Sequence, residues 1–113
     1  THCISSAASD VYKRQVQSYI EDHLRDNALS AEDAAELVHF SVSYLREIFK
    51  DMTGESFNEY LIRKRMEKAG ELLRNTSMKV SDIAEQCGYD NQRYFSSSFK
   101  KFYGCTPTEF KEF

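Results

Sequence analysis

The sequence predicts an all-α fold of about seven helices, on three observations. The chain of 113 residues contains one proline and four glycines, and these are the residues that interrupt helices. Apolar residues recur every three or four positions along most of the chain, which is the spacing of an amphipathic helix. No segment shows the strict alternation of a half-buried strand. The length suffices for one compact domain with a modest core.

The first half of the chain is predicted to hold three short helices. Apolar residues at helical spacing between Val16 and Leu24 indicate the first of them. Ser30 and Asp33 form an S-x-x-D start signal for the second, and Ser41 precedes the third. In the third helix we expect four buried side chains, those of Tyr44, Leu45, Ile48 and Phe49.

A long helix is predicted to begin at a capping box formed by Ser56 and Glu59 and to end near Arg74. Three shorter helices follow it: one over 80–87, one after Asp90 that buries Phe95, Phe99 and Phe102, and a terminal one that begins with Thr106, Pro107 and Glu109. Proline suits the first position of a helix, where no backbone N–H is needed.

An internal repeat relates the two halves. Residues 33–36 (DAAE) match residues 82–85 (DIAE) at an offset of 49, and after the turn the offset becomes 50, as Gly54 and Gly104 show. One extra residue in the second turn accounts for the change. Each copy is predicted as a short helix, a tight turn and a second helix closed by glycine, which is the layout of a helix-turn-helix. Two plain helical hairpins in a bundle would give the same pattern.

Two of these helices leave polar outward faces. The face after Ser41 holds Val42, Ser43, Arg46, Glu47 and Lys50, and the face after Asp90 holds Gln92, Arg93, Ser96, Ser97 and Lys100. Arginine pairs with guanine, Gln and Asn pair with adenine, Ser can serve either base, and Val can contact the thymine methyl group. The first face is weaker support for base reading, because Glu47 could pair with Arg46 or Lys50.

The charge of the chain is unevenly distributed. A formal net charge of −3 argues by itself against a nucleic-acid partner, because phosphate binding needs basic residues. Residues 1–56, however, carry ten acids and five bases, a net charge of −5, whereas residues 57–113 carry eight acids and ten bases, a net charge of +2. The stretch 91–103 has three bases and no acid.

Motifs at fixed spacing run through both halves. The second half contains Arg65-Met66, Ala69, Leu72-Leu73, the stretch 80–84 (VSDIA), Gly88-Tyr89, Tyr94-Phe95, Phe99-Lys100-Lys101, Gly104 and Thr106-Pro107. The first half contains Ser43-Tyr44-Leu45, Phe49-Lys50 and Gly54. From about Val16 to Phe113 the chain resembles the DNA-binding domain of AraC/XylS-type transcription regulators.

The resemblance implies two helix-turn-helix subdomains joined by a long linker helix, with two recognition helices in successive major grooves of double-stranded DNA. By position, base contacts would come from Val42, Ser43, Arg46 and Glu47 and from Asn91, Gln92, Arg93, Ser96 and Ser97. Phosphate contacts would come from Ser41, Lys50, Lys79, Lys100 and Lys101. Arginine is frequent in the family at the positions of Glu47 and Ser97, so we expect Arg46 and Arg93 to carry more of the base reading.

We expect four segments: an N-terminal extension over 1–15, the two subdomains over 16–55 and 76–113, and the linker helix over 56–75. Residues 1–15 match nothing in the family, so we expect a disordered or non-native extension, or an extension of the first helix. The chain would then be a fragment that lacks an upstream sensor or receiver domain; the alternative is a complete standalone regulator of about this size. The intact regulator is expected to be cytoplasmic and to recruit or block RNA polymerase.

Catalytic, metal-binding and membrane motifs are missing from the sequence. The three cysteines and three histidines are scattered without ligand spacing, and no nucleophile elbow, Walker loop or HExxH motif occurs. No apolar run approaches the roughly 18 residues of a membrane span. We therefore expect no enzyme activity, no cofactor, no metal and no membrane contact. The alternative function is a helical protein-interaction module that does not bind nucleic acid, which the acidic total favours.

Overall fold

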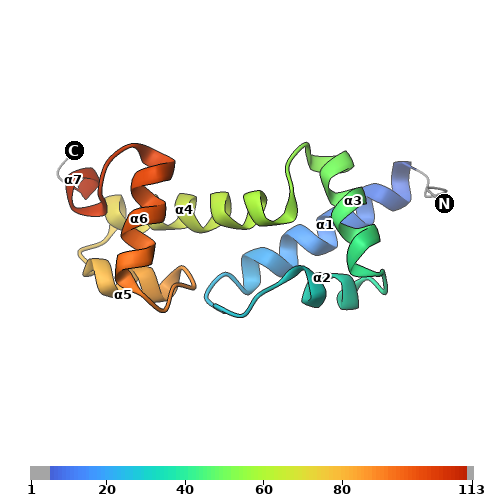
Figure 1. The fold of residues 1–113 in the computed structure, drawn as a ribbon, viewed down its shortest axis with the longest axis horizontal. Helices are drawn as coiled ribbons and strands as arrows, with labels where there is room; N and C mark the ends of the chain where they lie inside the picture. The colour runs from blue at the N-terminus through green and yellow to red at the C-terminus, as the bar shows by residue number, and fades with distance from the viewer. Residues whose placement is uncertain (1–5, 112–113) are drawn as a thin grey trace. The chain divides into compact units, whose positions relative to one another are not determined.

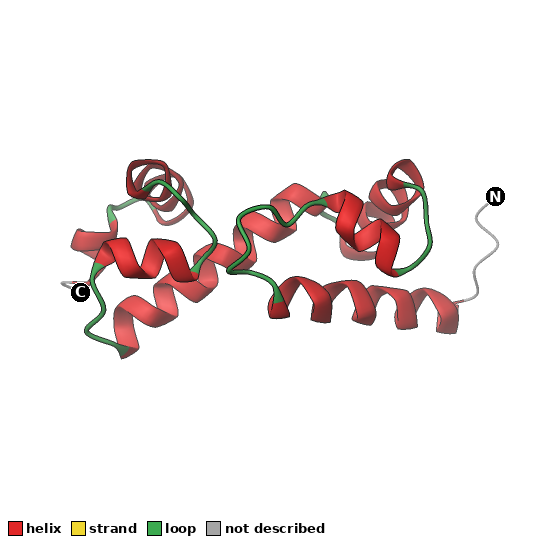
Figure 2. Ribbon diagram, turned by 90° about the horizontal axis from the view of Figure 1, so that it is seen from below, coloured by secondary structure: helices red, strands yellow, loops and turns green. Residues whose placement is uncertain are grey.

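The computed structural model describes residues 6–111, with side chains from residue 11 onward. All regular structure within this range is helical, as predicted (Figure 2). In chain order the helices are α1 (Ser6–Asp22), α2 (Ala31–Leu37), α3 (Val42–Thr53), α4 (Phe57–Asn75), α5 (Val80–Gln86), α6 (Gln92–Tyr103) and α7 (Pro107–Lys111) (Figure 1). Over the described residues, no helix is both long enough and apolar enough to cross a membrane.

The chain divides into two compact units. Unit 1 contains α1 through His23 and the segment Leu29–Leu61, and unit 2 contains Leu24–Ala28 and the chain from Ile62 onward. The helix α4 therefore contributes its first turn to unit 1 and the remainder to unit 2. The loop Leu24–Ala28 packs in unit 2 although the residues on either side of it belong to unit 1.

The first helix begins earlier than its apolar spacing predicts. It starts at Ser6, so residues 6–15 extend the first helix, whereas residues 1–5 lie outside the described residues. The ring of Tyr12 packs against Phe40, with 4.9 Å between the ring centroids. This long-range aromatic contact anchors the extension to the helices that follow.

The sequence repeat is present as a structural repeat. Helices α2 and α5 have seven residues each, and α3 and α6 have twelve residues each. The last two end at Gly54 and Gly104, whose φ angles of 82° and 84° lie in the left-handed region. Each of these glycine N–H groups donates to a carbonyl four residues earlier at 2.8 Å. The same C-cap thus closes both copies.

Unit 1 is held by an apolar core to which four helices contribute. Val16 and Ile20 of α1, Ala34 and Ala35 of α2, Leu45, Ile48 and Phe49 of α3, and Phe57, Tyr60 and Leu61 of α4 are buried. The Phe49 ring is central, since its centroid lies 5.6 Å from that of Phe57 and 5.1 Å from that of Tyr60. Because these rings come from α3 and α4, they fix the buried side of α3 and leave its opposite side exposed. Tyr44 is half-buried, not buried as expected.

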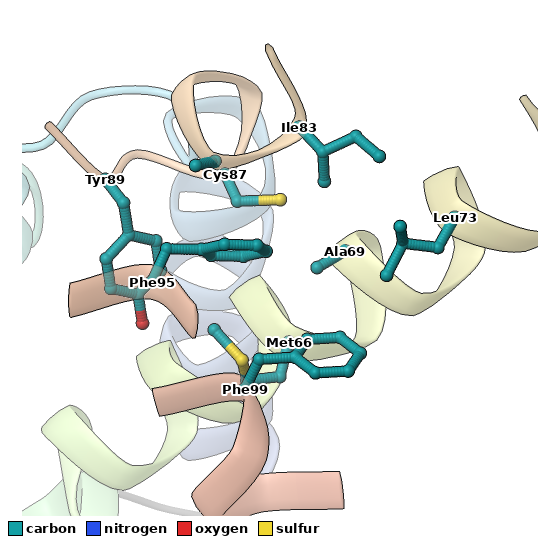
Figure 3. Packing of buried hydrophobic residues seen from close by; sticks show 9 residues of the cluster. Met66, Ala69, Leu73, Ile83, Cys87, Tyr89, Phe95 and Phe99 are labelled. Atoms are coloured by element: carbon teal, nitrogen blue, oxygen red, sulfur yellow. The ribbon is translucent and has the colours of Figure 1, made fainter. Parts of the chain in front are cut away.

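Unit 2 has a separate core, shown in Figure 3. Its members are Met66, Ala69 and Leu73 of α4, Ile83 and Ala84 of α5, Cys87 and Tyr89 of the turn, and Phe95 and Phe99 of α6. Phe102 does not join them: it is 42% exposed, so the expectation that it is buried was wrong. The buried stripe of α6 continues instead to Tyr103, whose ring lies 4.5 Å from Phe99. Tyr103 takes this place because its hydroxyl donates to the carbonyl of Met66 at 2.9 Å.

Gly70 makes room for that contact. A Cβ added at this position of α4 would lie 2.7 Å from the Tyr103 hydroxyl oxygen. A glycine inside a helix costs roughly 0.5–1 kcal/mol relative to alanine, so its presence here has a packing reason.

Candidate nucleic-acid interface

The helix α3 has a polar face that is exposed and an opposite, apolar face that is buried. The Ser41 hydroxyl accepts a hydrogen bond from the backbone N–H of Tyr44 at 3.2 Å and so caps the helix. Leu45, Ile48 and Phe49 are buried below. Of the predicted base readers on α3, Ser43, Arg46 and Glu47 are exposed and Val42 is half-buried.

The helix α6 is arranged in the same way. The Asn91 side chain accepts from the backbone N–H groups of Arg93 at 2.8 Å and Tyr94 at 3.3 Å, and Phe95 and Phe99 are buried. Of the predicted base readers, Asn91, Gln92, Arg93 and Ser97 are exposed and Ser96 is half-buried. Because Asn91 is the N-cap, its side-chain oxygen is already engaged, and its amide nitrogen is the group left to face a base.

The predicted phosphate ligands are all exposed, and each lies at or near a helix end. Ser41 and Lys79 are the N-cap residues of α3 and α5, and Lys50, Lys100 and Lys101 lie in the last turns of α3 and α6. The free N–H groups of a helix N-terminus favour an anion there. For α3 and α5, a phosphate placed at this end would therefore meet backbone dipoles as well as a side chain.

Two of the lysines also face an acid of their own chain. Hydrogen bonds from Ser56 lower the pKa of Glu59, and the charge of Lys50 adds to this effect. In the second copy, hydrogen bonds from Thr106 lower the pKa of Glu109, and Lys100 adds to it. Each capping glutamate thus stays ionised and offsets part of the positive charge that a phosphate would meet.

The helix α4 carries three consecutive basic residues, Arg63, Lys64 and Arg65, but they do not form an open phosphate-binding patch. Arg63 pairs with Glu67 at 3.0 Å, and Lys64 approaches the same carboxylate at 3.7 Å. Arg65 is 9% exposed and points inward, and this burial lowers its pKa. Of the three consecutive basic residues, Arg63 and Lys64 therefore form partly exposed ion pairs with Glu67, and the guanidinium of Arg65 is buried.

Tyr94 is a candidate that the sequence analysis missed. It is 63% exposed in the first turn of α6, next to Arg93, and its ring lies 5.6 Å from that of Tyr89. The repeat had equated Tyr94 with Tyr44, which packs on Phe40 with a centroid distance of 4.8 Å. No local signal distinguishes the two tyrosines, because their exposure depends on what the rest of each unit places beside them.

Comparisons with known proteins agree with this geometry. The sequence model of a family described as "Helix-turn-helix domain" matches residues 34–112. The chain is 48% identical over 71 residues to the HTH-type transcriptional activator RhaR of Mannheimia succiniciproducens, covering 63% of this chain and 26% of the relative. It is 41% identical over 95 residues to the uncharacterized transcriptional regulatory protein YesN of Bacillus subtilis, covering 81% of this chain and 26% of the relative.

A solved structure shows the same fold. The C-terminal domain of AraT, a response regulator from Geobacillus stearothermophilus, superposes with a TM-score of 0.87 and 37% sequence identity, covering 97% of this chain and 87% of that one. Two repeated short-helix, turn, long-helix units with polar outer faces define a double helix-turn-helix domain. The chain belongs to the helix-turn-helix family of AraC/XylS-type transcription regulators and is a DNA-binding domain of that type. It spans about a quarter of the length of the two curated relatives.

Proposed function

We propose that the chain reads a specific sequence of double-stranded DNA, with α3 and α6 as recognition helices in successive major grooves. The outer face of α6 carries this proposal. Asn91, Gln92, Arg93 and Ser97 are exposed there above a core of buried phenylalanines, and no acid occurs over 91–103. A solvated helix face ordinarily mixes acids and bases, whereas this one offers amide, hydroxyl and basic groups that suit base edges and phosphates, and no acid.

Arg46 and Arg93 are proposed as the principal base readers, since a guanidinium can bind guanine O6 and N7 together. Val42, Ser43, Glu47, Asn91, Gln92, Ser96 and Ser97 would complete the readout. Ser41, Lys50, Lys79, Lys100 and Lys101 would contact phosphates and set the register on the duplex. None of these groups is assigned a catalytic role, and we propose that the chain is not an enzyme.

The intact protein is proposed to be a longer bacterial regulator. The curated relatives are about four times longer than their match to this chain, and AraT is a response regulator. An upstream sensor or receiver domain would control access of this domain to DNA, and contact with RNA polymerase would convert binding into regulation. A protein that binds chromosomal DNA in a bacterium acts in the cytoplasm.

The first experiment is to select bound duplexes from a random pool and then measure affinity by fluorescence anisotropy. Arg93→Ala should weaken binding to the selected site by about 1–3 kcal/mol and relax preference at one base position. Arg14→Ala is the matched control, because it removes the same charge from an exposed position of α1 and should leave the base preference unchanged.

Two outcomes would contradict the proposal. One is no binding to any duplex at low salt, which would favour a protein-interaction module. The other is equal loss of affinity from Arg93→Ala and Arg14→Ala without any change in base preference, which would indicate attraction by charge alone.

A further inference from the structure

The loop Leu24–Ala28 lies directly against the turn that precedes α6, within unit 2. A Cβ added at Gly88 would lie 2.3 Å from the carbonyl oxygen of Leu24, and Gly88 has a φ of 83°. Only glycine adopts this conformation without strain and leaves space for the neighbouring backbone. The backbone of the loop at Leu24 therefore packs directly against the backbone of the turn at Gly88.

Arg65 of α4 contacts both the loop Leu24–Ala28 and the turn that precedes α6. Its Nη2 donates to the carbonyl of Asp26 at 2.9 Å, and its Cζ lies 5.6 Å from the centroid of the Tyr89 ring in the turn. A buried guanidinium needs hydrogen-bond acceptors, and the Asp26 carbonyl is one. Its Nε has no hydrogen-bond partner among the described residues. The Asp26 carbonyl and the Tyr89 ring thus bring the middle of the loop and one side of the turn into contact with the same side chain.

Asn27 adds a third contact at the surface. Its amide donates to a carboxylate oxygen of Asp90, and both side chains are exposed. Asp90 is the extra residue of the second turn, because Tyr89 aligns with Phe40 and Asn91 aligns with Ser41. The first repeat has no counterpart of this residue, so the contact is specific to the second copy.

The contacted residue adjoins the N-terminus of α6. Asp90 directly precedes Asn91, which caps the first turn through the N–H groups of Arg93 and Tyr94. A bidentate contact between arginine and guanine tolerates a displacement of only about 0.5 Å. A small movement of Asp90 would therefore be transmitted to the proposed base readers of this turn.

We propose that Asn27 and Arg65 are positioning residues that set the orientation of the first turn of α6, and through it the base specificity of the second recognition helix. This inference rests on the proposed function of α6. Asn27 acts from a loop between α1 and α2, at a sequence distance of 63 residues from Asp90, and through its contact with Asp90.

The test exchanges the two exposed groups, because a replacement of the buried Arg65 could unfold the protein. The variants are Asn27→Asp, Asp90→Asn and the double exchange, with base preference measured at each position of the selected site. Asn27→Asp places two carboxylates against each other, so it should relax preference at the positions read by α6 and weaken binding about 3–10-fold. Asp90→Asn keeps a side-chain oxygen that still accepts from the Asn27 amide, so its effect should be smaller. The double exchange should restore both, because the amide and the carboxylate then change places.

A change in net charge alone cannot produce this combination of changed base preference in a single variant and recovery in the double exchange. Asn27→Asp adds a negative charge, Asp90→Asn removes one, and the double exchange leaves the total unchanged. If charge alone mattered, the two single variants would change affinity in opposite directions and neither would alter base preference. Asn58→Asp, at an exposed position of α4, is the matched control for an added carboxylate.

Amide hydrogen exchange gives a readout that needs no DNA. In Asn27→Asp the N–H groups of Arg93 and Tyr94 should exchange faster, whereas the N–H of Tyr44, capped by Ser41 in the other unit, should not change. Unchanged exchange and base preference in Asn27→Asp, or no recovery in the double exchange, would overturn the positioning role while wild-type binding stands. Absence of wild-type binding would overturn the proposed function and the positioning role with it.

Discussion

Cys87 belongs to the unit 2 core with none of its surface exposed, and its thiol points into the cluster (Figure 3). Burial disfavours the thiolate and raises the pKa of Cys87 to about 11 from an ordinary value of 9.0. The thiolate is the reactive form of cysteine, so Cys87 acts as a small apolar group in the folded protein.

This pKa shift predicts a loss of stability at high pH. The unfolded chain releases the Cys87 proton at lower pH than the folded protein, so the contribution is fully present below pH 9 and is lost as pH rises towards about 11. A shift of this size corresponds to about 2–3 kcal/mol as an order of magnitude. Urea unfolding between pH 8 and pH 11 measures it.

The control for this prediction is Cys87→Ala, which removes the titrating group. Burial also raises the pKa of Tyr89 and of Tyr103, and both changes act in the same direction in either protein. The wild type should therefore lose more stability with rising pH than the variant. Equal slopes for the two proteins would contradict the assignment to Cys87.

At the scale of the elements, the turns of the two helix-turn-helix repeats need the same backbone conformation but use different residues for it. Both repeats place a residue in the left-handed region at the end of the short helix, with a φ of 59° at His39 and 83° at Gly88. A side chain in this conformation costs roughly 1–2 kcal/mol. His39 is exposed, whereas Gly88 is buried against the carbonyl of Leu24.

The contrast predicts opposite effects of exchanging the residue types. His39→Gly should stabilise unit 1 by about 0.5–1 kcal/mol, because relief of the strained φ exceeds the greater entropy of glycine in the unfolded chain. Gly88→Ala should destabilise by at least about 2 kcal/mol, since strain and a backbone clash add. Thermal unfolding of the two variants beside the wild type measures both. A destabilising His39→Gly would mean that the imidazole makes a contact that outweighs the strain.

For the whole molecule, the acidic total and the proposed DNA partner are compatible because the charges are separated along the chain. The first 56 residues carry the acidic excess, and the second half is net positive. Capping glutamates beside Lys50 and Lys100 reduce the attraction further. Non-specific affinity should therefore be modest, and specificity should depend on few contacts.

The salt dependence of binding tests the assignment of phosphate ligands. Lys79→Ala should reduce the slope of log affinity against log salt by about 0.9 and should weaken binding to all duplexes alike, because a phosphate contact carries no sequence information. Lys101→Ala should behave in the same way. Arg14→Ala should leave the slope unchanged. A sequence-dependent loss for Lys79→Ala would place that lysine among the base readers.

Much of the fold was predictable because its signals are local. Ser56 and Glu59 exchange hydrogen bonds at 3.1 and 3.2 Å across three residues, and the sequence identifies this capping box directly. The glycine stops after α3 and α6 are equally local. Phe102 was misplaced because the buried stripe of α6 passes through 95, 99 and 103, and the choice between 102 and 103 depends on the Met66 carbonyl of another helix.

For the candidate site, too, the features that depend on local sequence were predictable and those that depend on long-range packing were not. The residue types on the outer faces of α3 and α6 follow from helical spacing, so the sequence alone placed Arg46 and Arg93 on these faces and identified the family. The tertiary structure alone showed that Arg63 and Lys64 are paired, that Tyr94 is exposed, and that the loop Leu24–Ala28 and Arg65 support the turn before α6. The physical reason is that helix caps and amphipathic faces depend on neighbours within a few residues. The supporting contacts join groups 39 and 63 residues apart, which only packing brings together.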